Sequence, residues 1–164
     1  MIKKLIPATV EKLLQEAIKA ELEASHLYKH IANHLQRLGY LGAAKYFRSE
    51  YAQETEHYQK LADYLNDVGY VAELPELDSV DEDIDSLSSA IETAYDSEVE
   101  LMQKYVKWYQ AADPVTQQLL LGFLEHQRLS VGELGDLLSR IGLAGDDECA
   151  LLLIDKELEE WVIY

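Results

Sequence analysis

Five polar side chains of this sequence occupy positions where a helical protein ordinarily buries apolar ones. In the segment ETEHYQKLADYL, which begins at Glu54, a carboxylate and the imidazole of His57 lie about one helical turn apart. Counting in alternate steps of three and four along each helical segment marks the stripe of residues that faces a core. Each stripe is apolar except near its middle, where the polar residues are Glu21, Glu54, His57, Glu98 and Gln127. Carboxylates and imidazoles in such a place are candidate metal ligands or acid–base groups.

The energetic cost of buried charge favours the metal interpretation. A buried carboxylate without a partner costs several kcal/mol, or it must hold a proton, while a whole domain is stable by only about 5 to 15 kcal/mol. No Lys or Arg falls on these stripes to neutralise the three acids. Two divalent cations would do so, and three Glu with one His and open positions suit iron better than a closed zinc site. A carboxylate on one helix with Glu-x-x-His on another is part of the di-iron pattern of helix bundles.

The direction in which each residue faces separates this set from similar groupings nearby. A second Glu-x-x-His, Glu23 to His26, lies about 200° around its helix from the Glu21 stripe, so we expect it to face outward. Glu56 is expected to face outward for the same reason. His30 and His34 are four residues apart and could bind a stray metal, but a solvated face is the simpler interpretation.

Two residues on the stripes remain open to more than one interpretation. Glu50 lies one turn from the polar set and is either a surface group or a group that surrounds the ligands. Tyr28 lies two turns from Glu21 on the same face. It could hydrogen-bond a ligand, donate an electron or simply pack in the core.

The segments that must position these residues are helical. Runs of alternating Val, Ile and Thr are absent, so we predict an all-α protein, a single domain over residues 1–164, with helices at about 8–38, 41–68, 80–112, 114–142 and 146–160. Ser79 with Glu82 resembles a capping box for the third helix, Asp113-Pro114 opens the fourth, and Asp146 caps a short fifth. Two glycines inside the fourth helix, Gly132 and Gly135, should weaken or bend it.

Four long helices predict a bundle in which the polar positions meet. The first and second helices are joined by almost no residues and must be antiparallel, and the same holds for the third and fourth. The link GYVAELPELD is long enough to cross the whole bundle between the second and third helices. Because the polar residues lie near the midpoints of helices of similar length, we expect them at one height in the core.

Composition and charge exclude several classes of protein. Of 164 residues 48% are hydrophobic, which argues against disorder, and no apolar run is long enough to cross a bilayer. A net charge of −17 opposes binding to nucleic acid and attracts cations, although acidity can also serve solubility alone. The N-terminal residues lack the pattern of a secretory signal, and Cys149 is the only cysteine, so we expect a cytoplasmic protein in which Cys149 is a small buried residue.

Around these residues the sequence resembles the non-haem ferritins over nearly its whole length. The segments that carry the resemblance, in order, are AELEASHLY, AQETEHYQKLADYLNDVG, SEVELMQKY, LEHQRLSVGELGDLL and ALLLIDKEL. The resemblance implies a ferritin-type four-helix bundle with a long crossover and a short C-terminal fifth helix. It also implies a ferroxidase that oxidises two Fe(II) with O₂ or H₂O₂ and a mineral store inside a homo-oligomeric shell of 24 subunits.

The resemblance also implies a role for each site residue. Glu21 and His57 would ligate the first iron, and Glu54 would bridge the two irons. Glu98 would ligate the second iron, and Gln127 would lie beside it as a weak or water-mediated contact.

Several positions depart from relatives of this kind. Arg128 ends the EHQR segment where bacterioferritins carry a second Glu-x-x-His, and Thr55 stands where their haem-binding Met would be, so no haem is expected. The region of a third iron site holds Gln53, His126, Leu129 and Ser130 in place of acids. Gln53 and Gln59 replace acids that are linked with mineral nucleation, and the segment VTQQLLLG lacks the acids that line entry channels in animal ferritins. The loss of the nucleation acids bears on storage capacity more than on oxidation.

Two other functions remain open from the sequence. One is a di-iron oxidase or peroxidase without substantial storage, although no CxxC pairs for electron transfer are visible. The other is a non-catalytic acidic scaffold whose buried acids are protonated or hydrated. Uptake of iron beyond two ions per chain distinguishes storage from oxidation alone, and stoichiometric binding of iron distinguishes both from a scaffold.

Overall fold

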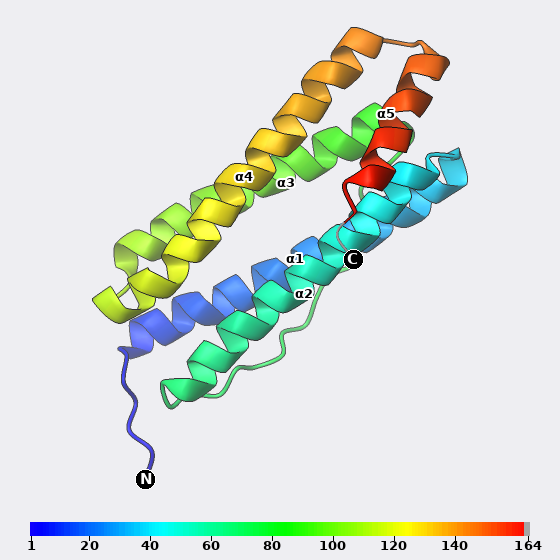
Figure 1. Ribbon diagram of the computed structural model, residues 1–164. Coiled ribbons are helices and arrows are strands. Elements are labelled where there is room, and N and C mark those ends of the chain that lie inside the picture. Colours follow the sequence, from blue (N-terminus) through cyan, green and yellow to red (C-terminus); the bar gives the residue numbers. More distant parts are fainter. Residues whose placement is uncertain (163–164) are drawn as a thin grey trace.

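A computed structural model describes residues 1–162 and shows five α-helices, with no strand among these residues. The helices are α1 (Ala8–Leu38), α2 (Leu41–Asp67), α3 (Leu87–Ala111), α4 (Pro114–Ala144) and α5 (Glu148–Glu160). In Figure 1, α1 and α2 lie side by side and run in opposite directions, as do α3 and α4, and α5 folds back at one end of the bundle. The predicted all-α four-helix bundle with a short fifth helix is confirmed.

Local chemistry explains where most helices begin and end. α1 stops at Gly39, whose φ of 95° lies in the left-handed region that glycine adopts without steric cost. Asp113 caps α4 by accepting the backbone N–H groups of Val115 and Thr116, with Pro114 in the first turn as predicted. α4 continues to Ala144, two residues past the predicted end, and its interior glycines do not interrupt it.

Two predicted helix starts and one predicted burial were wrong. α3 begins at Leu87 rather than near residue 80, because Ser86 and Ser89 form a reciprocal capping box while the segment from Ser79 stays extended. α5 begins at Glu148 with Asp147 as its cap, not Asp146. Cys149 is exposed rather than buried, because it lies in the first turn of α5 on the side that faces solvent.

The crossover between α2 and α3 runs the length of the bundle, as Figure 1 shows, and it contacts α1 near both of its ends. Near its start, the side chain of Gln15 donates to the Val71 carbonyl at 2.8 Å and accepts the N–H of Glu73 at 3.1 Å. Near its end, the ring of His30 contacts the Glu82 carbonyl at 2.7 Å. Of the two histidines expected on a solvated face, His30 therefore helps to hold the crossover against α1.

The apolar core is divided into two clusters by the polar residues. One cluster centres on Ile31, Phe47 and Ile91, and the other on Leu14, Leu61 and Leu120, all buried. Glu21, Glu54, His57, Glu98 and Gln127 belong to neither cluster although they are also buried. The polar residues therefore occupy a slab near the middle of the bundle, as the midpoint argument predicts.

The short helix α5 is fixed to the start of α2 by one buried carboxylate. Asp155 accepts the N–H of Gly42 at 3.1 Å and the N–H of Ala43 at 2.7 Å, which are free donors of the first turn of α2. A Cβ at Gly42 would lie 1.9 Å from the Asp155 carbonyl oxygen, so only glycine permits this approach. Across the described residues, none of the helices has the length and apolar character needed to span a membrane.

Candidate metal centre

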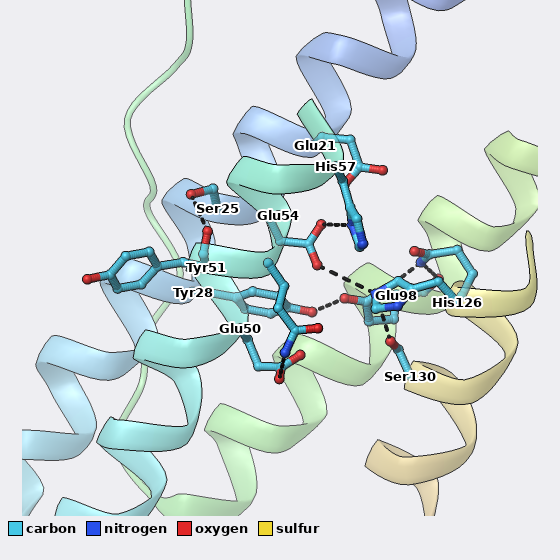
Figure 2. Close-up of polar contacts among 12 residues, drawn as sticks. Glu21, Ser25, Tyr28, Glu50, Tyr51, Glu54, His57, Glu98, His126 and Ser130 are labelled. Atoms are coloured by element: carbon cyan, nitrogen blue, oxygen red, sulfur yellow. Dashed lines mark hydrogen bonds and ion pairs between the residues drawn. The ribbon is translucent and has the colours of Figure 1, made fainter. Parts of the chain in front are cut away.

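The five polar stripe residues converge in the slab from four helices. Glu21 lies on α1, Glu54 and His57 on α2, Glu98 on α3 and Gln127 on α4. Their relative exposures are only 0%, 1%, 8%, 2% and 0% in that order. Figure 2 shows Glu21, Glu54 and His57 facing Glu98 across the space between the helix pairs. The outward-facing controls behave as predicted, since His26 and Glu56 are exposed.

Histidine joins the two carboxylates on the α1–α2 side of the slab. The Nδ1 atom of His57 lies 3.1 Å from Oε2 of Glu54 and 3.6 Å from Oε2 of Glu21. The second of these atoms, Glu21 Oε2, is fully buried and has no hydrogen-bond partner. Among described residues, the ion pairs of these carboxylates involve only histidines, so no Lys or Arg supplies compensating charge.

An amide and a carboxylate face each other on the α3–α4 side. The Nε2 atom of Gln127 donates to Oε2 of Glu98 at 2.5 Å. The other amide atom, Gln127 Oε1, is buried without a hydrogen-bond partner. Buried oxygen atoms are nearly always hydrogen-bonded in folded proteins. Two free acceptor oxygens in one acidic slab therefore indicate that the site accommodates a positively charged species.

Two tyrosines hydrogen-bond carboxylates of the slab. The hydroxyl of Tyr28 on α1 donates to Glu98, and the hydroxyl of Tyr105 on α3 donates to Glu21. The first contact supports one of the three interpretations left open for Tyr28, a hydrogen bond to a candidate ligand. Burial is the main reason that the pKa of each phenol lies well above its usual value, so both tyrosines are neutral donors.

The three carboxyl groups do not ionise independently. Burial is the largest cause that raises the pKa of Glu54, and the neighbouring Glu21 adds to it. Burial also raises the pKa of Glu98, in spite of hydrogen bonds from Tyr28 and Gln127. For Glu21 burial acts in the same direction, but the neighbouring Glu54, His57 and Tyr105 outweigh it, so its pKa is lowered. Burial therefore opposes ionisation of Glu54 and Glu98, whereas Glu21 ionises more readily than an ordinary glutamate.

His126 was not among the ligands predicted from the sequence. Its Nε2 atom lies 3.9 Å from Oε1 of Glu54 and 3.3 Å from the hydroxyl of Ser130, and its ring centroid lies 4.2 Å from that of His57 (Figure 2). One ligand atom each from Glu54, His57 and His126 lie within 4.8 Å of one another. Position 126 is adjacent to Gln127 on the stripe of α4. This adjacency is the feature of the sequence from which His126 could have been predicted as a ligand.

Beside the slab, a cavity opens between α2 and α4. Glu50 and Glu133 line it together with Tyr46, which donates a hydrogen bond to Glu133 at 2.9 Å. Burial, Glu133 and Glu98 raise the pKa of Glu50 to about 8. Of the two interpretations left open for Glu50, a surface group or a group that surrounds the ligands, the structure supports the second. Glu50 is a half-buried acid next to the candidate ligands.

These features define a class of protein, the four-helix bundles with a candidate carboxylate–histidine metal site in the core. The donor set fits divalent cations, because carboxylate oxygens, one or two imidazoles and a free amide oxygen converge without a basic side chain.

Comparison with known proteins identifies the family. The sequence model of the ferritin-like domain family (Ferritin) matches residues 11–144, and the chain belongs to this family. It is 28% identical to a probable bacterial non-heme ferritin-like protein of Haemophilus influenzae over 158 residues, covering 94% of this chain and 96% of that protein. It is 29% identical to the bacterial non-heme ferritin of Escherichia coli over 156 residues, covering 93% and 94%.

A solved structure agrees with these sequence relatives. The open pore ferritin of Archaeoglobus fulgidus superimposes with a TM-score of 0.90 at 25% identity, covering 93% of this chain and 96% of that one. The predicted resemblance to non-haem ferritins is confirmed. At the level of the family, the function is iron storage with ferroxidase chemistry.

Proposed function

We propose that this chain oxidises Fe(II) at the slab with O₂ or H₂O₂ and passes the ferric product to a mineral store. The observation that carries the proposal is the pair of free buried oxygens, Glu21 Oε2 and Gln127 Oε1, in a slab without basic side chains. A scaffold with no need for cations would gain stability by replacing such groups with apolar residues. Bound cations supply the reason to retain them.

Each side chain of the slab has a role in this proposal. Glu21 and His57 hold the first Fe(II), and Glu54 bridges to the second through its other oxygen. Glu98 holds the second Fe(II), with the free oxygen of Gln127 beside it. Cations compete with protons for Glu54 and Glu98, because burial raises the pKa of both carboxyl groups. Affinity for Fe(II) should therefore rise with pH, and proton release should accompany binding.

The test is oxidation of Fe(II) added without air and then exposed to it. Two irons per chain should be oxidised in a rapid phase, and Glu54→Ala should abolish that phase because it removes the bridging carboxylate. Glu56→Ala is the matched control, since Glu56 lies two residues away on the same helix but is exposed. Equal rapid phases in the wild type and Glu54→Ala would contradict the assignment of the site.

Storage and assembly are tested separately from oxidation. We propose a homo-oligomeric shell of 24 subunits in the cytoplasm, without haem, since Thr55 follows Glu54 and offers no thioether. Light scattering measures the assembly, and iron loading well beyond two ions per chain establishes storage. Oxidation limited to two ions per chain would instead favour a di-iron oxidase or peroxidase without storage.

A further inference from the structure

The slab contains a reciprocal arrangement of acids and tyrosines on α1 and α3. On each helix a candidate ligand carboxylate is followed seven residues later by a tyrosine, Glu21 by Tyr28 and Glu98 by Tyr105. Each tyrosine donates its hydroxyl hydrogen to the carboxylate of the opposite helix. Because α1 and α3 run in opposite directions (Figure 1), the two hydrogen bonds are related by an approximate two-fold axis through the slab.

The surroundings of the two tyrosines differ in one respect that matters for electron transfer. The ring of Tyr28 packs on Phe47 at a centroid distance of 5.5 Å, and phenylalanine is hard to oxidise. The ring of Tyr105 stacks on Phe123 at 5.2 Å but also contacts Trp108 edge-on at 5.0 Å. Tyrosine and tryptophan are the most readily oxidised aromatic side chains, so Tyr105 has a direct redox neighbour.

Trp108 extends this contact to the protein surface. It is 8% exposed, and its indole N–H donates to Oε2 of Glu16 at 3.3 Å. Trp108 and Glu16 also line a surface cavity of about 390 Å³ between α1 and α3. Each oxidisable group thus has a carboxylate in position to take its proton: Glu21 for Tyr105 and Glu16 for Trp108.

We propose that Tyr105, with Trp108 behind it, is a second redox-active group of the centre and connects it to the surface. The inference rests on the proposed ferroxidase function. Reduction of one O₂ to two waters needs four electrons and four protons, and two Fe(II) supply only two electrons. Tyr28 and Tyr105 supply the other two electrons and two of the protons, and the remaining two protons come from solvent. The products are two Fe(III), two waters and two neutral tyrosyl radicals.

The proton movements follow the hydrogen bonds. Each phenol releases its proton to the carboxylate that it contacts as its electron leaves. Trp108 then transfers one electron to the Tyr105 radical and its N–H proton to Glu16. Glu21 has passed the phenol proton on to the reduced oxygen, so it takes a proton from solvent and returns it to Tyr105. The radical is thereby moved to the surface, where further Fe(II) or another one-electron reductant in solution quenches it.

The test combines peroxide yield with radical spectroscopy during a single turnover of two Fe(II) per chain. The wild type should release little H₂O₂. Tyr105→Phe leaves an odd number of electrons that cannot complete reduction to water, so it should release about one H₂O₂ per O₂. Freeze-quenched samples of Trp108→Phe should show a larger tyrosyl signal than the wild type, because the radical stays on Tyr105. Ring-deuterated tyrosine should narrow that signal.

Matched measurements keep a structural role separate from a redox role. Tyr64→Phe removes a hydroxyl that contacts Thr116 rather than a site carboxylate, and it should leave peroxide and radical yields unchanged. Anaerobic Co(II) titration should show two ions per chain in Tyr105→Phe and in Trp108→Phe. Tyr105→Phe protein with intact binding but wild-type peroxide and radical yields would overturn the relay and leave the ferroxidase standing. Wild-type protein that oxidises no Fe(II) would overturn both proposals.

Discussion

Glu50 shows at the scale of one residue how the metal-free site opposes folding. Its pKa is raised from 4.5 to about 8, first by burial and then by Glu133 and Glu98. Between those two pH values the folded chain holds a proton that the unfolded chain has lost. The free energy of unfolding therefore falls as pH rises through this window. Charge near the slab is tolerated for function rather than for stability.

Replacing Glu50 tests this statement. Glu50→Gln keeps the shape of the side chain and removes its ionisation, so the metal-free variant should lose less stability than the wild type between about pH 5 and about pH 9. The difference at the upper end should be about 1 to 3 kcal/mol, below the full value of the shift because Glu50 is partly exposed. Urea unfolding at several pH values measures it, with exposed Glu56→Gln as control. Parallel pH curves for the wild type and Glu50→Gln would show that Glu50 titrates normally.

His126 gives a second prediction at this scale. Since its Nε2 atom lies near Oε1 of Glu54, it can complete a nitrogen-rich position with His57. His126→Gln should weaken binding of Zn²⁺ by about 10-fold or more, which is the scale of loss when even a supporting group around a metal site is removed. Calorimetric titration measures the affinity, and exposed His26→Gln should match the wild type. Unchanged affinity in His126→Gln would mean that the histidine only lines the cavity.

The residues of the slab were predictable to the extent that they lie on the apolar stripes. Helical counting finds Glu21, Glu54 and Glu98 because a charge among core positions stands out in the sequence. Tyr105 was not predicted as a site residue, since a tyrosine among apolar residues looks like packing until its hydroxyl partner is known. His126 lies one position away from the core-facing stripe of α4. It comes near Glu54 because of the way α4 is oriented about its own axis, which the sequence does not specify.

At the scale of the elements, the contact between α5 and α2 depends on one glycine and one carboxylate, Gly42 and Asp155. Gly42→Ala should destabilise the protein by about 2 kcal/mol or more, because the added methyl would push Asp155 away from the α2 N-terminus. Gly122→Ala is the matched control, a helical glycine on α4 with nothing within 4 Å of an added Cβ. It should raise stability by up to about 1 kcal/mol. Equal effects of the two substitutions on thermal unfolding would contradict the contact.

Helix existence was predictable from periodicity, whereas two helix starts were not. Both wrong starts lie in acidic, serine-containing segments that offer several caps close together, as at Ser79 and Ser86 or Asp146 and Asp147. Which cap is used depends on tertiary contacts: Ile84 is buried, and it anchors an extended segment that would otherwise continue α3 backwards. The strongly periodic interiors of α1 and α4 offered no such choice of caps, and α4 remains helical through its glycines.

At the scale of the whole molecule, the polar slab divides the core into two apolar clusters that lie on either side of it. Two half-sized cores contribute less cooperative packing than one. The acidic side chains of the slab between them also repel one another when no cation is present. We therefore expect metal to be a large contributor to stability. Metal at 100 times its dissociation constant adds about 2.7 kcal/mol by mass action alone.

Exposed leucines on α5 argue that the isolated chain is not the working form. The inner side of α5 is buried through Ile154, Asp155 and Leu158, but Leu152 and Leu153 are 52% and 64% exposed. Neighbouring apolar side chains left in water favour association with another surface.

The Leu152→Glu, Leu153→Glu double variant should therefore sediment as much smaller particles than the wild type, because charge would be buried at the subunit contact. Each free chain should keep its helical content and its two-ion stoichiometry, since α5 contributes no residue to the slab. Methionine at both positions retains the apolar surface and should preserve the assembly. Identical sedimentation of the glutamate variant and the wild type would mean that α5 lies outside the contacts that build the oligomer.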